Sequence, residues 1–348
     1  MPKIDQLFEI MLQKGGSDLH MNQGQKPKLR VHGHLESIES FPVLTEPMMV
    51  ELMREIADQS YWDRYVKRGD IDFAYSMGDR ARFRASYLKQ MHGLGAVFRT
   101  IPSKILTLEQ LEAPDSFKSF GELRSGLILI TGPTGSGKST TLAAIIDFIN
   151  SHKRRKIITI EEPVEFMHQS KQSTVIHREV GPDTDSFYSG LKGALKSDAN
   201  VILVGEMRDR ETIELALTAV EMGILVFGTL HTNSAAKTVD RIVDVFPAKQ
   251  KDEIRSVLAN TLRGVVSQQL LRSSDGSRRY AAQEILLFTG SLPAVIRSGD
   301  TNKLQAVIQA GKKNGMRTMD DHLMELVTAG KVSKEEALLK AFDKARFS

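Results

Sequence analysis

A glycine-rich segment in the first half of the chain has the spacing of a phosphate-binding loop. It follows the pattern G-x-x-x-x-G-K-[ST], between an apolar strand, Leu127 to Ile130, and a helix that begins near Lys138. Glycines let the chain turn so that successive backbone N–H groups face one centre, where the helix adds the positive end of its dipole. The residues predicted to bind ATP are Gly132, Pro133, Thr134, Gly135, Ser136, Gly137, Lys138, Ser139 and Thr140.

Two side chains of this loop have further roles in that interpretation. Lys138 would reach the β- and γ-phosphates, and the Ser139 hydroxyl would ligate the Mg²⁺ that accompanies ATP. The alternative is a glycine-rich turn between a strand and a helix that binds nothing. The complete order of strand, loop, lysine, hydroxyl and helix favours the ATP site.

An acidic residue follows the apolar strand Val201 to Val204. A carboxylate at this place, Glu206, can hold Mg²⁺ through water or orient the water that attacks the phosphate. The alternative is a solvated acid near a helix start, where the helix dipole favours it. Just beyond it, Arg208 and Asp209 are expected to pair with one another.

A second acidic cluster, Glu161, Glu162 and Glu165, follows the strand Ile157 to Ile160. Crowded carboxylates repel one another, and a metal ion or a polarised water would relieve that repulsion. The alternative is an exposed acidic turn.

A histidine, His231, ends the next strand beside hydroxyl side chains. A neutral imidazole there can hydrogen-bond the terminal phosphate and respond to its loss. A lone histidine more often has a structural role.

Arginines alternate along a strand in the first hundred residues. Arg82 and Arg84 share one face of this strand, opposite Phe83, and Arg99 lies in a later strand. Guanidinium groups brought to a phosphate held by another domain or subunit would stabilise the charge of the transition state. A plain basic strand face is the alternative.

The chain is longer than one hydrophobic core usually supports, since it has 348 residues. We predict a small α+β domain over 1–100, a linker over 101–117 and an ATPase domain over 118–348. The first domain begins with a helix whose apolar face includes Ile4, Leu7, Phe8, Met11 and Leu12. It continues with the strands Ile71–Ser76, Ala81–Leu88 and Gly95–Thr100, with Gly78-Asp79 as a hairpin turn.

Strands and helices alternate after the linker. Short, fully apolar strands separated by helices indicate a parallel sheet covered on both faces, with ligands at the carboxyl ends of its strands. From Lys249 onward the pattern is helical, and we expect it to stay mostly helical to the end.

Composition narrows the class of protein. The net charge is only +4, from 47 basic and 43 acidic residues, which does not indicate a nucleic-acid surface. The absence of cysteine excludes disulfides and thiolate zinc sites and fits a reducing compartment. No secretory signal is evident, and no apolar run approaches the ~18 residues of a membrane span. We therefore expect a cytoplasmic protein without membrane insertion.

Taken together, these motifs resemble the type II/IV secretion ATPase superfamily, most closely the type IV pilus retraction ATPases of twitching motility. The resemblance spans nearly the whole chain. Beyond the phosphate loop, three segments carry it: Thr159 to Phe166 resembles the aspartate box, Val204 to Asp209 the Walker B segment, and Gly228 to Asn233 the histidine box.

The resemblance implies a PAS-like N-terminal domain, a RecA-like P-loop ATPase domain and a helical C-terminal region. Six copies would form a homohexameric ring whose domain rotation acts on an inner-membrane pilus platform protein, and indirectly on pilin, with the ring docked at that membrane from the cytoplasm. Arg84 and Arg99 would reach the phosphates, Glu206 would serve Mg²⁺ or the hydrolytic water, Glu165 would be an essential acid, and His231 would sense the γ-phosphate. Both Glu206 and Glu165 remain candidates for the general base.

One segment departs from the retraction motors. They carry Ala-Ile-Arg-Asn-Leu-Ile-Arg-Glu in the C-terminal region, where this chain has Ser291 to Ser298 with only the second half loosely matching. The chain is therefore either a principal retraction motor or an accessory paralogue. Pilus-extension and type II secretion ATPases are disfavoured, since they usually hold a tetracysteine zinc element. A ring-shaped nucleic-acid translocase would need basic residues interleaved with aromatics, and no such cluster is present.

Overall fold

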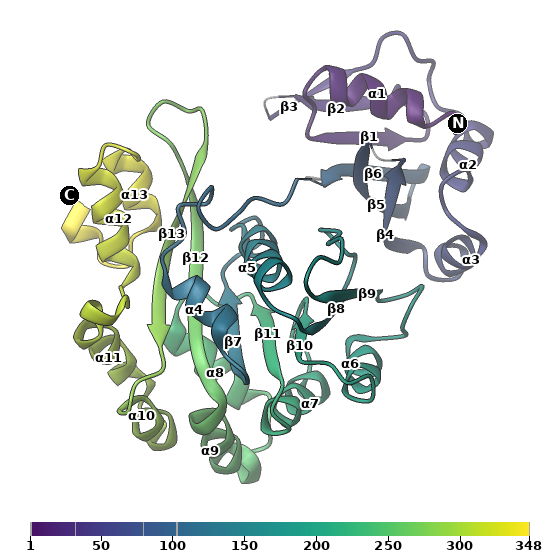
Figure 1. The fold of residues 1–348 in the computed structure, drawn as a ribbon. Helices are drawn as coiled ribbons and strands as arrows, with labels where there is room; N and C mark the ends of the chain where they lie inside the picture. The colour runs from purple at the N-terminus through teal and green to yellow at the C-terminus, as the bar shows by residue number, and fades with distance from the viewer. Residues whose placement is uncertain (1, 32, 79, 102–103, 348) are drawn as a thin grey trace. The chain divides into compact units, whose positions relative to one another are not determined.

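The computed structural model describes residues 2–31, 33–78, 80–101 and 104–347. The chain divides into two compact units (Figure 1). Unit 1 runs as far as residue 104 and also includes residues 162–167. Unit 2 comprises residues 105–161 and the chain from residue 168 onward. Each unit combines a sheet with helices, so the α/β class predicted from the sequence is confirmed.

The described part of unit 1 is built on an antiparallel sheet of six strands in the order β3-β2-β1-β6-β5-β4. Its strands are β1 (Asp18–Asn22), β2 (Lys28–Val31), β3 (His34–Ser37), β4 (Asp70–Met77), β5 (Ala81–Gln90) and β6 (Gly93–Ile101). Its helices are α1 (Asp5–Gln13), α2 (Glu46–Arg54) and α3 (Gln59–Arg68).

The core of unit 1 forms where the apolar face of α1 meets the sheet. Ile4, Leu7, Phe8 and Met11 are fully buried, as the helical spacing predicts, whereas Leu12 is 37% exposed. The ring of Phe8 stacks on a phenylalanine of β5 with the centroids 4.1 Å apart. The predicted meander corresponds to β4, β5 and β6, while Asp79 of its turn lies outside the described residues.

Among the described residues, unit 2 has a sheet of seven strands in the order β13-β12-β7-β11-β10-β8-β9. Its strands are β7 (Gly126–Thr131), β8 (Lys156–Glu161), β9 (Thr174–Glu179), β10 (Val201–Val204), β11 (Leu225–Leu230), β12 (Leu262–Arg272) and β13 (Arg279–Leu287). All neighbouring pairs are parallel except β12 with β13. The predicted parallel sheet is therefore present, with an antiparallel strand at one edge.

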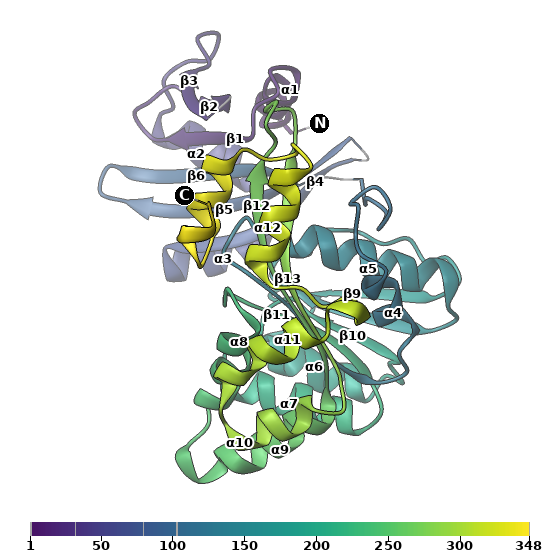
Figure 2. The same cartoon turned by 90° about the vertical axis from the view of Figure 1, so that its left-hand side faces the viewer.

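Helices cover both faces of this sheet, as Figures 1 and 2 show. In β7, Leu127 and Leu129 face one hydrophobic cluster and Ile128 and Ile130 face the other, so both faces of the strand are buried. The Ile128 face packs on α4 (Ser116–Glu122) and α5 (Lys138–His152). The Leu127 face packs on α6 (Phe187–Leu195), α7 (Arg210–Glu221), α8 (Ala235–Asp244), α9 (Lys251–Thr261), α10 (Leu292–Ser298) and α11 (Leu304–Ala310).

The expectation of a mostly helical chain from Lys249 onward is wrong for residues 262–287. Helix α9 ends at Thr261 and β12 begins at the next residue. No turn residues separate the two elements, so the sequence does not signal the change from helix to strand. Val265 pairs with Leu129 of β7 and with Leu286 of β13, and both strands thus belong to the sheet. Tertiary pairing with distant strands overrides the local helical pattern here.

Part of the predicted linker also belongs to the core of unit 2. Residues 102–103 lie outside the described residues, but Leu108 is 2% exposed and Phe117 is fully buried against the sheet. Leaving the apolar side chains of Leu108 and Phe117 in water would cost free energy, and this part of the chain therefore packs against the sheet.

Two C-terminal helices, α12 (Met319–Thr328) and α13 (Lys334–Lys340), cover the far ends of β12 and β13 (Figure 2). A buried carboxyl on β13, Glu284, accepts the backbone N–H of Ala235 at 2.8 Å and that of Met319. It therefore holds the first residues of both α8 and α12. Burial raises the pKa of Glu284, although these two hydrogen bonds oppose the rise.

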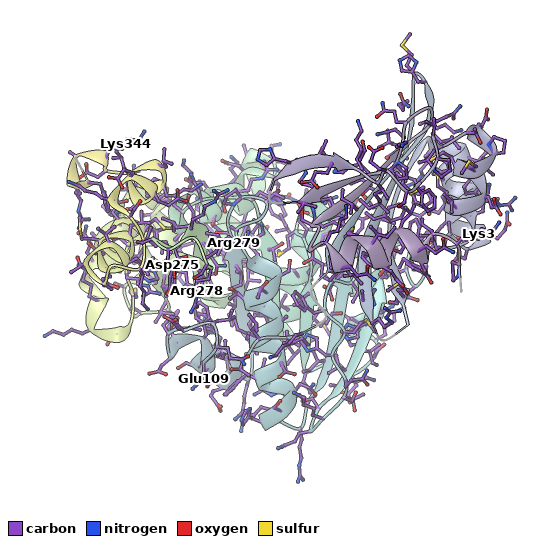
Figure 3. All side chains as sticks on the ribbon, turned by 90° about the horizontal axis from the view of Figure 1, so that it is seen from above. Lys3, Glu109, Asp275, Arg278, Arg279 and Lys344 are labelled. Carbon is purple, nitrogen blue, oxygen red and sulfur yellow. The ribbon has the colours of Figure 1, made fainter. Side chains whose placement is uncertain are left out.

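The turn that joins β12 to β13 is held by polar side chains. Figure 3 labels Asp275, Arg278 and Arg279 together at this turn. Hydrogen bonds from Ser273 and Ser277 lower the pKa of Asp275 to about 2. Within the described ranges, no helix has the length and apolar character that crossing a bilayer would require.

Candidate functional site

The phosphate loop lies between β7 and α5, in the context that the sequence predicts. Three of its glycines have positive φ, with values of 143° at Gly132, 79° at Gly135 and 87° at Gly137. A Cβ atom at Gly132 would lie 2.2 Å from the carbonyl oxygen of Gln268, which no other residue could tolerate. Both the path of the loop and its close approach to β12 therefore depend on glycine.

Two polar side chains of the loop suit an anionic ligand. Ser136 is 3% exposed, and its hydroxyl has no hydrogen-bond partner among the described residues. Lys138 donates from Nζ to the carbonyl oxygens of Gly132 at 2.8 Å and Pro133 at 3.1 Å. Phosphate oxygens would bind this ammonium more strongly than neutral carbonyls do. The loop thus fits the triphosphate of a nucleotide.

The phosphate loop rests on a buried glutamine that the sequence motifs do not indicate. Gln268, on β12, donates from Nε2 to the carbonyl oxygen of Ser136 at 2.6 Å and accepts from the hydroxyl of Thr141 at 3.0 Å. Beside it, the hydroxyls of Thr131 and Ser267 lie 2.8 Å apart. A polar Ser-Gln-Gln run inside an otherwise apolar segment was the available signal, since buried polar groups need partners.

Glu206 and His231 come together at the ends of two neighbouring strands. His231 Nε2 lies 3.1 Å from Glu206 Oε1, and the Arg208 guanidinium lies 2.7 Å from Oε2. The phosphate loop is adjacent, because the N–H of Gly132 donates to the carbonyl oxygen of Leu230 at 3.3 Å. The structure therefore assembles the loop, the carboxylate and the imidazole at one edge of the sheet, as expected for parallel strands.

The electrostatics of this edge keep Glu206 ionised. Burial by itself opposes the charged form, but the hydrogen bond and charge of Arg208, followed by those of His231, outweigh it. The pKa of Glu206 is therefore lowered from its ordinary value. A carboxylate held anionic and 19% exposed is suited to hold a water molecule or a water-bound cation.

The predicted pairing of Arg208 with Asp209 is wrong. Asp209 is the N-cap of α7, and its carboxylate accepts from the N–H of Thr212 at 2.8 Å and from its hydroxyl at 2.9 Å. Capping satisfies a backbone donor at the helix start that would otherwise have no partner, so both oxygens of the Asp209 carboxylate are engaged by Thr212 of α7. Arg208 is left to bind Glu206.

Arg208→Gln should shift the pH dependence of turnover. Without the guanidinium the pKa of Glu206 rises, so the carboxylate is protonated at a higher pH. The acid limb of the kcat/KM profile for ATP should therefore move upward by up to about one pH unit. The control is Arg210→Gln, which removes an exposed arginine of α7 paired with Glu214. An unchanged acid limb in Arg208→Gln would contradict this account of Glu206.

The acidic cluster divides between the two units. Glu161 ends β8 in unit 2, whereas Glu162 and Glu165 lie in the segment 162–167 that belongs to unit 1. The chain returns to unit 2 at His168, whose N–H donates to Nε2 of His177 at 3.0 Å. The role of Glu165 as an essential acid stays a prediction.

The arginines of unit 1 occupy one face of its sheet. Arg84 on β5 is directly opposite Arg99 on β6, and each has an acidic partner. Arg84 lies 3.4 Å from Asp72, and Arg99 donates from Nε to Asp18 at 2.8 Å. The two acidic partners offset the repulsion between arginines that lie directly opposite one another. The contact of these arginines with phosphate stays a prediction.

The residues at the phosphate loop fit a cation that arrives with its nucleotide. Ser139 lies in the first turn of α5, and the anionic Glu206 lies two residues beyond the end of β10. In the part of the chain that the structure describes, no group of three His, Asp or Glu side chains could hold a metal ion without other ligands. This arrangement suits Mg²⁺, which keeps several waters and binds through one or two protein groups and phosphates.

The chain is similar to known proteins over most of its length. Residues 1–338 match the family described as Type II/IV secretion system protein. The type IV pilus retraction ATPase PilT of Pseudomonas aeruginosa is 46% identical over 97% of this chain and 98% of its own length. The type IV pilus ATPase PilU of the same organism is 36% identical, over 97% and 88%. A crystal structure of the pilus retraction motor PilT with bound ADP covers 99% of this chain and 98% of that one, at 38% identity and a TM-score of 0.90.

These matches confirm the resemblance inferred from the motifs. They extend over both units, and the structural match confirms the secretion-ATPase fold. The chain therefore belongs to the family of type II/IV secretion system proteins.

Proposed function

We propose that this chain hydrolyses ATP to power the retraction of type IV pili, and thereby twitching motility. The observation that carries this proposal is the 46% identity, over nearly the full length of both chains, with a retraction ATPase. It is supported by the intact phosphate loop beside the Glu206–His231 pair. Assembly into a homohexamer, docking from the cytoplasm on an inner-membrane platform protein and an indirect action on pilin are parts of the same proposal.

In this proposal, different residues of unit 2 bind the phosphates, hold the cation and activate the attacking water. The backbone N–H groups of the loop and Lys138 bind the phosphates, and Ser139 holds Mg²⁺, which neutralises charge on the phosphate oxygens when bound. Glu206 orients the attacking water or accepts its proton. Since Nε2 of His231 lies against Glu206, loss of the γ-phosphate would be transmitted directly to that carboxylate. Glu165, in the segment 162–167 of unit 1, remains the alternative general base.

Arg84→Ala should lower turnover more than nucleotide affinity. A guanidinium that stabilises charge in the transition state contributes to kcat, and its loss should reduce kcat about 10- to 100-fold while changing the Kd for ATP less than about threefold. The control is Arg80→Ala in the same strand-turn region, which removes an exposed pair with Glu9. Steady-state hydrolysis and fluorescent-nucleotide titration provide the two quantities. Unchanged kcat in Arg84→Ala would leave this residue as part of a basic strand face.

An accessory retraction ATPase is the second candidate, because one segment departs from the retraction motors. Residues Ser291 to Ser298 include α10, which packs on α9 and is tied to it by a 2.6 Å hydrogen bond from Arg297 to Asn260. The relative named as a retraction ATPase, PilT, is 46% identical to this chain, whereas the one named only as a type IV pilus ATPase, PilU, is 36% identical, which supports retraction as the activity.

Expression in a cell that assembles pili but lacks its own retraction motor tests the proposal. Restored twitching supports the principal motor. Absent twitching from a chain that still hydrolyses ATP when purified would support the accessory role. A purified, folded chain without hydrolysis would overturn both.

A further inference from the structure

The glutamine beneath the phosphate loop also contacts the neighbouring strand. Oε1 of Gln268 accepts a second hydrogen bond, at 3.1 Å, from Nε2 of Gln283 on β13. Gln268 is 2% exposed and Gln283 is 5% exposed. Neither amide has bulk water as a substitute partner, and breaking one contact would leave a buried polar group unsatisfied.

Gln283 in turn binds the C-terminal region. Its Oε1 accepts from the Arg317 guanidinium at 2.8 Å, and its backbone N–H donates to Nδ1 of His322 at 2.9 Å. Arg317 precedes α12 and pairs through its backbone with Ile285 of β13, and His322 lies on α12 itself. The contacts thus run without a break from the phosphate loop to α12.

The protonation states match these contacts. Burial lowers the pKa of His322 to about 3, so the imidazole is neutral and its Nδ1 can accept the N–H of Gln283. Burial also lowers the pKa of Arg317, to about 10, which leaves the guanidinium charged at neutral pH. A charged donor strengthens its hydrogen bond to Gln283.

The phosphate loop packs closely against β12. A Cβ atom at Gly137 would lie 2.9 Å from Nε2 of Gln268, and one at Gly132 would lie 2.2 Å from its carbonyl oxygen. A displacement of the loop must therefore either carry Gln268 with it or break the bond to Ser136.

We infer that Gln268 is a positioning residue for the phosphate loop and that, through Gln283, it couples nucleotide binding to the order of α12. This inference rests on the proposed function, since it concerns the same nucleotide. Coupling between two sites is reciprocal. A nucleotide at the loop should stabilise α12, and loosening the contacts at α12 should weaken nucleotide binding.

Shape-conserving substitutions test whether loosening these contacts weakens nucleotide binding. Gln268→Met and Gln283→Met keep the volume but remove the amides. The Kd for fluorescent ADP should rise about tenfold in Gln268→Met, and about fivefold in Gln283→Met and Arg317→Met. The matched control is Gln269→Met, next along β12, whose amide contacts Lys340 in α13 and not the loop. Circular dichroism melting of each full-length variant establishes that it is folded.

Hydrogen exchange in the unsubstituted protein tests whether nucleotide stabilises α12. Adding Mg·ADP to the full-length protein should slow amide exchange in α12 about fivefold, as well as in the loop and α5. The double variant with both glutamines replaced should lose this protection of α12 and show non-additive effects on Kd, because the two amides share one hydrogen bond.

The outcomes separate this inference from the proposed function. Weakened binding in the two glutamine variants, with the control unchanged and α12 protected by nucleotide, supports the coupling. Unchanged Kd values, or protection confined to the loop and α5, would overturn it while leaving the ATPase proposal intact. If a variant fails to fold, exchange in the unsubstituted protein decides. A folded, unsubstituted chain that binds no ADP would overturn the proposed function and the coupling together.

Discussion

Lys138→Ala should remove nearly all nucleotide binding and turnover. The ammonium lies over the loop on two carbonyl oxygens, within reach of any phosphate that the loop binds. Removing the cationic partner of a bound polyphosphate costs about 2–5 kcal/mol, so the Kd for ATP should rise by roughly 30-fold to several thousandfold. Hydrolysis should fall further still, because the same charge also stabilises the transition state. Titration with fluorescent nucleotide and a phosphate-release assay measure the two effects.

A lysine at the other end of the same helix provides the control. Lys153 is the C-cap of α5 and pairs with Glu122 on the surface. Exposed ion pairs contribute little, so Lys153→Ala should bind and hydrolyse ATP normally. Binding in Lys138→Ala that matches the unsubstituted protein would defeat the assignment of the phosphate loop.

Glu206→Gln should separate binding from hydrolysis. The amide has the shape of the carboxylate but neither its charge nor its basicity, and general-base catalysis typically contributes 10²- to 10⁴-fold. We therefore expect kcat to fall by roughly 10³-fold while the Kd for ATP changes less than about threefold. Single-turnover measurements should show that the chemical step is the one slowed.

This substitution also distinguishes the two candidate general bases. Glu214→Gln, an exposed acid of α7 paired with Arg210, is the matched control and should have no effect. Normal turnover in Glu206→Gln together with loss of turnover in Glu165→Gln would assign the base to Glu165. Loss in Glu206→Gln with an unaltered chemical step in Glu165→Gln would assign it to Glu206.

The site was most predictable where chemistry depends on local spacing. The phosphate loop, Glu206 and His231 each follow an apolar strand, and parallel strands bring their carboxyl ends to one edge. The short distance between Glu206 and His231 therefore follows from the order of strands β10 and β11. The pairing of Arg208 was less predictable, because it depends on which neighbouring acid is already engaged in capping a helix.

The strands β12 and β13 could not be recognised from local pattern. Val265, Val266 and Leu271 are all buried, so the segment lacks the alternation of a half-exposed strand, and it follows α9 with no turn residue between them. What makes it a strand is pairing with β7, more than 130 residues away in the sequence. Gln268 and Gln283 were missed for the same reason, since their importance depends on that pairing.

Glu284 has a consequence for how far this protein can be shortened. One carboxyl on an internal hairpin anchors the helix that follows the histidine segment and also a helix close to the carboxyl terminus, and Phe347 is itself 1% exposed. Deleting the C-terminal helices would remove one of the two N–H donors that hydrogen-bond this carboxyl. It would also expose apolar surface that these helices cover. The smallest fragment of this chain that folds must therefore include the C-terminal helices as well as the nucleotide-binding core. A fusion or tag should be added to the chain and should not replace these helices.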